Sequence, residues 1–242
     1  MLDIETAPNK GYFWGLWDQN IAINQIVEPG YTLCWAAKWY GQRDILFDSI
    51  NESKPATMIR KIHTLLDEAD AVVHFNGRKF DVPTLNREFL MLGLAPPSQY
   101  RQIDLLKVTR SEFRFASNKL DYVVQQLALG GKVTHKGMDL WKGCMNGNAK
   151  DWAVMKRYNI MDVKLLERYY KKVLPWIKNH PNWGVYLDGD RPTCRNCGST
   201  KVKKNGTERT NTLTYQRYRC ASCGTPVRDR ERLAPAREGL TV

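Results

Sequence analysis

Two Cys-x-x-Cys pairs near the C-terminus constrain the fold of this chain more than any other feature of its 242 residues. Cys194 and Cys197 form the first pair, Cys220 and Cys223 form the second, and a glycine follows each pair. Four thiolates at such spacing are typical of a tetrahedral zinc site with no open position, which is a structural site. The sequence therefore predicts one structural Zn²⁺ that holds a small unit over residues 193–228.

The segment between the cysteine pairs is basic, and we expect a two-stranded hairpin with its tip near residues 205–211. The string CRNCGS…YQRYRCASCG resembles the zinc ribbons of transposase-type and other DNA-handling proteins. Basic side chains neutralise phosphates and aromatic rings stack on bases, so a ribbon of this kind could bind nucleic acid. The alternative is a ribbon that docks on a protein, such as a replication or recombination protein. The candidate contacts to nucleic acid are Lys201, Lys203, Lys204, Arg217 and Arg219, with Arg209, Tyr215 and Tyr218 beside them.

The positive charge of the chain is concentrated in the same region. The formal net charge is +12, and residues 191–242 hold 12 of the 37 basic residues but only 4 of the 25 acidic ones. Such a surplus favours a polyanionic partner and says little about the fold. A solvated tail that keeps the chain soluble would explain the charge equally well.

The rest of the chain alternates between strand-like and helix-like patterns, which predicts a mixed α/β layer fold over residues 1–178. β-branched and aromatic residues predict strands at 31–40, 43–47 and 71–75. Apolar residues that recur on one helical face predict helices at 56–69, 82–92, 120–127 and 149–173. A linker is expected over residues 179–192, and a flexible tail over residues 229–242.

Four carboxylates stand in positions that could bring them together. Asp3 and Glu5 lie two residues apart in the strand-like string LDIET, so both side chains would point to one face. Asp81 follows the strand expected at 71–75 across a short turn. Asp162 lies four residues after Tyr158 in the last helix, so these two side chains would share a helical face. Taken singly, each acid would be explained as a helix cap or a surface charge.

Carboxylate oxygens are the ligands that suit Mg²⁺ or Mn²⁺. Two such ions can activate an attacking water and stabilise the leaving oxygen of a phosphodiester. If the four acids converge, the sequence predicts a site for two Mg²⁺ or Mn²⁺ ions.

Three strings of this sequence resemble, in order and spacing, the exonuclease motifs of the DEDD nucleases: LDIET, HFNGRKFDVPTLNREF and YNIMDVKLLERYY. The resemblance is nearest to the proofreading domains of family B DNA polymerases and to stand-alone bacterial and bacteriophage relatives. It covers about residues 1–175, includes the string KLDYVVQQLALGGK, and implies an RNase H-like fold. It also implies that Asp3, Glu5, Asp81 and Asp162 bind the metal ions.

The tyrosine branch of that family (DEDDy) is the one that this chain resembles. Tyr158 would then orient the attacking water or help to deprotonate it. The histidine branch places its histidine five residues before the last Asp, where this chain has Arg157. Asn76 and Phe80 match positions of the second motif that approach the substrate terminus, although a turn or packing role would also explain them. Asp104 is expected to serve as a local cap outside the site.

The first strand departs from the family pattern. Several apolar residues normally precede the Asp-x-Glu of that strand, whereas only Met1 and Leu2 precede Asp3 here. Either the chain begins late or its first strand is clipped. A clipped strand would hold two of the ligands less rigidly and would weaken metal binding.

An aromatic segment, Tyr12 to Trp17, follows the first motif. We expect it to form a hydrophobic hairpin that closes over the core. The alternative is a platform on which the bases near the terminal nucleotide stack.

The chain shows no pattern of a membrane or secreted protein. No apolar stretch is long enough to span a bilayer, and the first residues lack the basic and then apolar run of a signal peptide. Cysteine pairs that bind metal also fit a reducing compartment. We therefore expect a cytoplasmic protein of a bacterial cell or of a phage-infected host, with no membrane partner.

The resemblance implies a metal-dependent 3′→5′ exonuclease that degrades single-stranded or frayed 3′ ends of DNA, in replication or repair. One alternative is a 3′→5′ exoribonuclease. Another is a nucleic-acid-binding or partner-recruiting protein with a vestigial nuclease fold. A transposase core is suggested by the ribbon alone, and the Tyr-x-x-x-Asp helix fits it poorly.

Overall fold

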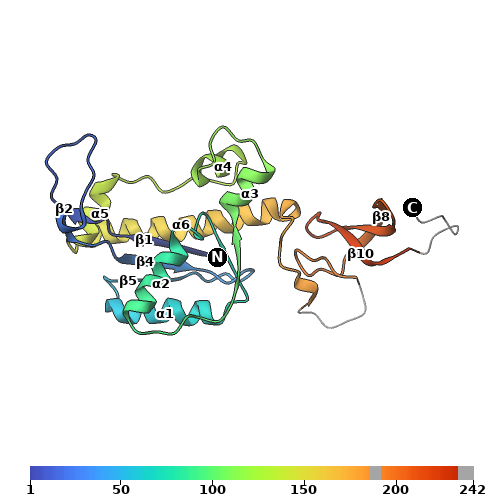
Figure 1. Cartoon of the computed structure of the whole chain (residues 1–242), viewed down its shortest axis with the longest axis horizontal. Coiled ribbons are helices and arrows are strands. Elements are labelled where there is room, and N and C mark those ends of the chain that lie inside the picture. The colour runs from blue at the N-terminus through green and yellow to red at the C-terminus, as the bar shows by residue number, and fades with distance from the viewer. Residues whose placement is uncertain (186–191, 234–242) are drawn as a thin grey trace. The chain divides into compact units, whose positions relative to one another are not determined.

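A computed structural model describes residues 1–185 and 192–233 of the chain (Figure 1). The chain divides into two compact units, Met1–Tyr169 and Tyr170–Val242. In the described part of the chain, we find no helix with the length and apolar character needed to cross a membrane.

A central sheet organises the first unit. Strand β1 (Leu2–Thr6) pairs antiparallel with β4 (Thr32–Ala37), which pairs antiparallel with β5 (Leu46–Ser49). Strands β6 (Ala71–His74) and β7 (Arg101–Asp104) pair parallel to each other, and β6 contacts β1. Every residue of β4 is buried because β4 is the middle strand and both of its faces are covered.

Helices cover both faces of this sheet. On one face, α1 (Pro55–Asp67) and α2 (Asp81–Met91) share an apolar core with β1 and β4. On the other face, α5 (Met138–Met145) and α6 (Ala149–Val173) form a second core with β4. Two further helices, α3 (Leu105–Glu112) and α4 (Leu120–Gln126), lie between α2 and α5 in the chain. The predicted mixed α/β layer fold is confirmed, with α6 as its longest helix (Figure 1).

The aromatic segment lies in a hairpin that projects from the first unit, between the short strands β2 (Lys10–Gly11) and β3 (Ile26–Glu28) (Figure 1). Trp14 is 99% exposed and Trp17 is 83% exposed. The prediction that this segment closes over the core is therefore wrong. A short 3₁₀ turn at Ile23–Gln25 and hydrogen bonds between Gln25 and Tyr12 hold the base of the hairpin, and its apolar tip extends into solvent.

The second unit contains a three-stranded antiparallel sheet, which we call the C-terminal sheet. Its strands are β8 (Val202–Arg209), β9 (Thr214–Cys220) and β10 (Pro226–Arg232), with β9 in the middle. The expected two-stranded hairpin thus gains a third strand, and its turn lies at 210–213 rather than at 205–211.

Two expected irregular segments of the second unit contain regular structure. Strand β10 includes residues 229–232 of the expected flexible tail: after an irregularity that follows Arg228, Arg232 pairs with Tyr215 of β9. The rest of that tail beyond residue 233 lies outside the described residues. The expected linker contains a 3₁₀ turn at Trp183–Val185, and its residues 186–191 also lie outside the described part.

Candidate active site and zinc site

Strand β1 presents two acids on the face of the sheet that α6 covers. Leu2 and Ile4 are buried in the core beneath α1 and α2, so the alternating side chains of Asp3 and Glu5 point to the opposite face, as predicted. The cross-strand neighbours of the two acids on β4 are Ala36 and Cys34. These small side chains leave space above the sheet beside the two carboxylates.

Helix α6 brings a third acid to the same place. Tyr158 and Asp162 lie one turn apart and share a face of the helix, as predicted. Asn159 lies between them and is fully buried. Its side-chain amide donates to the carboxylate of Asp3 (2.6 Å, to Oδ2) and to the carbonyl oxygen of Asp3 (3.2 Å). This contact ties α6 directly to β1.

Three carboxylates converge between β1 and α6. Asp3, Glu5 and Asp162 each offer an oxygen, and these oxygens all lie within 4.8 Å of one another. The Oδ1 atom of Asp162 is buried and has no hydrogen-bond partner among the described residues. An unsatisfied carboxylate oxygen in a cluster of hard ligands is the arrangement that a divalent cation would complete.

The electrostatics of the cluster also favour a cation. Burial and the neighbouring carboxylates raise the pKa of Asp3 well above its usual range. Burial and the nearby charge of Asp162 raise the pKa of Glu5 to about 8. Like charges that are held together away from water resist ionisation, and a divalent cation would supply the missing counter-charge.

Lys132 is the positive group within the cluster. Its ammonium forms an ion pair with Asp162 and lies 3.2 Å from the hydroxyl of Tyr158. Burial lowers the pKa of Lys132, but the carboxylate of Asp162 outweighs this effect, and the net pKa is raised. Lys132 is therefore charged at neutral pH, and it fixes the side chains of Asp162 and Tyr158 relative to each other.

Asp81 stands at the start of α2, outside the group of three converging oxygens. Its Oδ1 atom accepts a hydrogen bond from the backbone N–H of Ile4 (3.1 Å). Burial raises the pKa of Asp81 to about 6, and its charge in turn raises the pKa values of Asp3 and Glu5. Asp81 is thus bonded to β1 at Ile4, the residue between Asp3 and Glu5 in the sequence. A direct role of Asp81 as a metal ligand stays a prediction.

The turn before α2 depends on a glycine. A Cβ atom on Gly77 would lie 2.6 Å from the ring of His74 and 3.0 Å from the carboxylate of Asp81. Asn76 adopts a positive φ of 68°, and its N–H donates to the carboxylate of Asp104 (2.9 Å). Asp104 also caps α3 by accepting from Leu106 N, which confirms the predicted role as a cap.

The predicted substrate contacts of the second motif lie on this turn. The side chain of Phe80 is 46% exposed at the start of α2, and Asn76 is half-buried. Both positions are open to a ligand, and their contact with a substrate stays a prediction.

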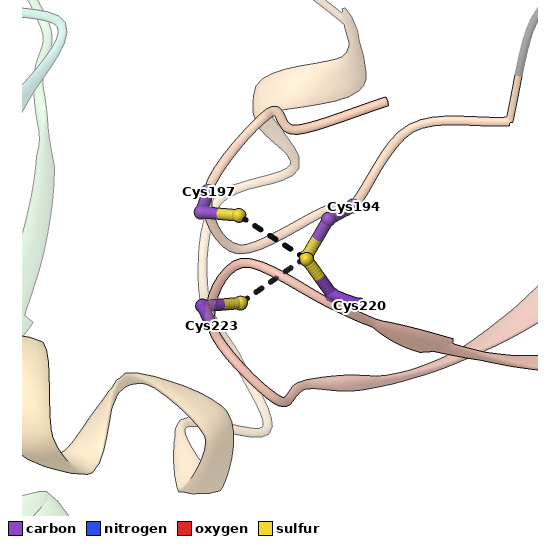
Figure 2. A group of neighbouring side chains, drawn as sticks. All are labelled: Cys194, Cys197, Cys220 and Cys223. Atoms are coloured by element: carbon purple, nitrogen blue, oxygen red, sulfur yellow. Dashed lines mark hydrogen bonds between the residues drawn. The ribbon is translucent and has the colours of Figure 1, made fainter. Parts of the chain in front are cut away.

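The four cysteines of the second unit converge as predicted. Their sulfurs lie within 4.8 Å of one another, and Figure 2 shows them pointing toward a common centre. Two pairs, Cys194 with Cys223 and Cys197 with Cys220, have Sγ atoms 3.6 Å apart. Tetrahedral Zn–S bonds of about 2.3 Å would place sulfurs slightly less than 4 Å apart, so the cluster fits Zn²⁺ and is compatible with a zinc ribbon.

The knuckle of the first cysteine pair is attached to the segment that follows α6. Asn196 is buried between the two cysteines, and its amide donates to the carbonyl oxygens of Leu174 (2.7 Å) and Ile177 (3.3 Å). Leu174 and Ile177 lie at the 3₁₀ turn Leu174–Trp176 that follows α6, and the carbonyl oxygen of Leu174 also accepts from Ile177 N. The cysteine cluster therefore holds the start of the second unit as well as its sheet.

The basic residues that the sequence singled out do not form one group. Lys203 lies opposite Arg219 on the neighbouring strand, whereas Lys204 lies opposite Tyr218. Successive residues of a strand point to opposite faces, so the two lysines are on different sides of the C-terminal sheet. Arg217 shares a face with Arg219, and Lys201 precedes β8.

Comparison with known proteins places the first unit in a family. A family model described as the RNase H superfamily matches residues 34–174, which is more than half of the chain. The chain belongs to the RNase H superfamily. Membership of this superfamily supports a nuclease function and the use of divalent metal ions. No curated protein sequence matches the chain significantly.

The RNase H-like fold is also seen in a solved structure. A family B DNA polymerase from the hyperthermophilic archaeon Pyrobaculum calidifontis superposes with a TM-score of 0.53 at 17% sequence identity. The match covers 72% of this chain and 24% of the polymerase, so the chain spans about a quarter of that polymerase. At this identity the similarity concerns the fold alone.

Several residues of the RNase H-like site were not predicted from the sequence. Trp141 hydrogen-bonds Glu5, and the rings of His135, Trp141 and Tyr158 pack edge to face around the cluster. Asn159 could have been found, because it lies three residues before Asp162 on the same helical face. Lys132 and Trp141 lie outside any periodic pattern that the acids share, so nothing in their spacing pointed to the site.

Proposed function

We propose that the chain is a metal-dependent 3′→5′ exonuclease that degrades single-stranded or frayed 3′ ends of DNA. One observation carries the proposal: oxygens of Asp3, Glu5 and Asp162 lie within 4.8 Å of one another between β1 and α6, the helix that carries both Asp162 and Tyr158. This arrangement agrees with the order and spacing of the three DEDDy motifs in the sequence. The fold that the chain shares with a family B DNA polymerase is consistent with DNA as the substrate.

In this proposal each residue of the cluster has a role of its own. Two Mg²⁺ or Mn²⁺ ions, when bound, would promote attack by water and stabilise the leaving oxygen of the phosphodiester. Asp3, Glu5 and Asp162 would hold the ions, with Asp81 as the fourth acid. Asn159 holds the carboxylate of Asp3 in place.

Tyr158 would orient the attacking water. Burial and the charge of Asp162 raise the pKa of its phenol to about 12, so the hydroxyl stays protonated near neutral pH. A neutral hydroxyl can donate and accept hydrogen bonds, which suits a role in positioning better than one in removing a proton. Lys132 would hold this hydroxyl and the carboxylate of Asp162 in fixed positions relative to each other.

The proposed C-terminal zinc ribbon would help to hold the nucleic acid. Its unit contributes much of the surplus positive charge of the chain, and basic groups bind phosphates through release of counter-ions. A replication or repair setting follows from a substrate with frayed 3′ ends. Docking of the ribbon on a replication or recombination protein is the competing role.

Digestion of single-stranded DNA labelled at its 5′ end tests the proposal. We expect a ladder that shortens from the 3′ end, releases 5′-monophosphates and requires added Mg²⁺ or Mn²⁺. The zinc-loaded protein should be compared with and without these ions, because a chelator would also remove zinc. An Asp162→Ala variant should form no ladder. Cleavage that begins internally, or a ladder that Asp162→Ala retains, would refute the proposal.

The same assay separates the remaining alternatives. A matched RNA oligomer that is degraded faster than the DNA would make the chain an exoribonuclease. Tight binding of both oligomers without any cleavage would assign the chain to the class of binding proteins with a vestigial nuclease fold.

A further inference from the structure

The pairing of the C-terminal sheet gathers basic residues of all three strands on one face. Lys203 of β8 lies opposite Arg219 of β9, and Arg228 of β10 lies opposite Arg217 of β9. Directly paired residues project to the same side of a sheet, and so do residues two apart on one strand. Lys203, Arg217, Arg219 and Arg228 therefore share one face, which we call the basic face.

An aromatic ring lies among these cations. Tyr215 is two residues before Arg217, which puts it on the basic face, and Arg232 of β10 is paired with it. The guanidinium carbon of Arg228 lies 4.4 Å from the centre of the Tyr215 ring. Stacked guanidinium and phenol groups of this kind offer a planar surface on which a base can stack.

The cations of the basic face are exposed to solvent, and two of its arginines are held in place by hydrogen bonds to the backbone. Arg217 donates to the carbonyl oxygen of Asn205 (3.1 Å), and Arg219 donates to that of Gly224 (3.4 Å). Within residues 192–233, Arg228 pairs with Glu208, whereas no acidic side chain pairs with Lys203, Arg217 or Arg219. The guanidinium groups of Arg217 and Arg219 are therefore anchored by backbone carbonyl oxygens, and their other N–H groups remain for a ligand.

The opposite face has a different character. Val202, Tyr218 and Val227 lie along its centre, and Tyr218 donates its hydroxyl hydrogen to Asp229 (3.2 Å). Lys204 is on this face, beside Tyr218. The sheet is thus divided into a basic face with a stacked ring and a face with a partly apolar centre.

We propose that the basic face binds the phosphate backbone of a single strand of nucleic acid, and that Tyr215 stacks on one of its bases. Residues two apart on a strand are separated by about 7 Å. The cations therefore form a spaced row across three strands, which suits a repeating polyanion better than a single anionic group. This assignment rests on the proposed function only in taking nucleic acid as the substrate. It adds Arg228 to the predicted contacts, assigns stacking to Tyr215 rather than to Tyr218, and excludes Lys204 and Arg209, which lie on the opposite face.

Binding of a fluorescein-labelled oligothymidylate, measured by anisotropy at several salt concentrations, tests the proposal. The zinc-loaded protein is used without added Mg²⁺ or Mn²⁺, so that no cleavage is required. We expect Arg217→Ala with Arg219→Ala to weaken binding about tenfold. The slope of log K against log salt should fall by about 1.4, because each contact to a single strand contributes about 0.7.

The matched control is Lys204→Ala with Arg209→Ala, which removes the same charge from the opposite face, because Lys204 is paired with Tyr218 and Arg209 with Thr214. Its affinity should stay within about twofold of the parent, and its salt slope should not change. Equal losses in the two double variants would overturn the proposal, because the binding would then follow net charge alone. Unchanged binding in the double variant of the basic face would also overturn it. Zinc content and melting temperature confirm that each variant is folded.

Stacking by Tyr215 is tested with an abasic oligomer. Tyr215→Ala should weaken binding of the oligothymidylate and leave binding of the abasic strand unchanged, whereas Tyr215→Phe should bind both as the parent does. An equal loss on both strands would contradict stacking. These experiments measure binding alone. If the exonuclease assay gives no ladder but binding still depends on the basic face, the nuclease proposal is refuted and the proposal for the basic face is not.

Discussion

Lys132 occupies the position beside Asp162 where a cation is needed, and it reaches that position from a segment outside the regular elements. Its ammonium compensates part of the negative charge of the cluster and also competes with a metal ion for the same carboxylate. The residue therefore has two opposing effects, one on geometry and one on metal affinity. The effect on geometry would change kcat, and the effect on metal affinity would change the Mg²⁺ concentration that activity requires, so the two can be measured separately.

Lys132→Ala should lower kcat and at the same time lower the Mg²⁺ concentration that gives half-maximal activity. Loss of the ammonium frees Asp162 for the metal but lets Asp162 and Tyr158 shift, and such misplacement costs about a hundredfold in rate. Titration of Mg²⁺ in the exonuclease assay measures both quantities. Lys142→Ala, which removes an exposed lysine of α5, is the control and should change neither. A raised Mg²⁺ requirement would contradict the competition.

Asp3→Asn should abolish activity while stabilising the metal-free fold. The pKa of Asp3 is raised so far by burial and its neighbours that a neutral side chain suits the empty cluster. Asparagine can still accept the hydrogen bond from Asn159, but it removes the charge that binds metal. We expect activity to fall about a thousandfold, which corresponds to several kcal/mol of lost metal-based stabilisation. Melting curves at pH 8 without Mg²⁺ should show a higher melting temperature, and a lower one would count against this reading of the cluster.

At the scale of helices and strands, the sequence predicted those site residues whose spacing matches the repeat of a strand or of a helix. It did not predict site residues outside such a repeat. The face of Asp3 and Glu5 follows from the two-residue period of a strand, and the pairing of Tyr158 with Asp162 follows from the helical period. Helix α6 was predicted with both of its boundaries, because a long apolar stripe ends before Pro175.

The elements that were not predicted are short or depend on distant contacts. Helices α3 and α5 have 8 residues each, and α5 contains Gly143, so their local signals are weak. The third strand of the C-terminal sheet was missed because the segment after Cys223 is rich in charge and has little apolar alternation. The exposure of the β2–β3 hairpin could not be inferred either, since its composition is typical of buried hairpins.

Asn159→Ala tests how strongly α6 is joined to β1. The change removes two partly buried hydrogen bonds to Asp3, and leaving such groups unpaired costs about 1–3 kcal/mol. Urea denaturation should show that loss in the free energy of unfolding, together with reduced activity, because Asp3 is no longer held. Lys164→Ala, an exposed position of the same helix, should change stability by less than about 0.5 kcal/mol. A similar effect of both changes would show that the contact adds nothing specific.

At the scale of the whole molecule, the acidic cluster predicts how stability depends on pH when Mg²⁺ and Mn²⁺ are absent. The folded-state pKa of Glu5 is about 8 and that of Asp81 about 6, both above their ordinary values of 4.5 and 3.8. Between the ordinary and the raised values the folded protein binds more protons than the unfolded chain does. Stability is therefore greatest at low pH within this window and falls as the pH rises toward 8.

Melting temperatures of the zinc-loaded protein between pH 5 and about 8.5 check this prediction. We expect a decline with pH in the absence of Mg²⁺ and a flatter profile in its presence, because the metal binds the ionised carboxylates. A profile that rises through this window without Mg²⁺ would contradict the assignment of raised pKa values. The Asp3→Asn variant should show a smaller decline than the parent.

The projecting β2–β3 hairpin gives the protein an intrinsic optical reporter. Trp14 and Trp17 are open to water at its tip, whereas Trp35 and Trp152 are enclosed in the two cores of the RNase H-like domain. Iodide should therefore quench the emission of the tip, together with that of the half-exposed Trp176, and leave that of the enclosed indoles almost unchanged. Any molecule that settles on the tip would shield it from iodide and shift the emission to shorter wavelength, so occupancy of the hairpin can be followed without attaching a dye.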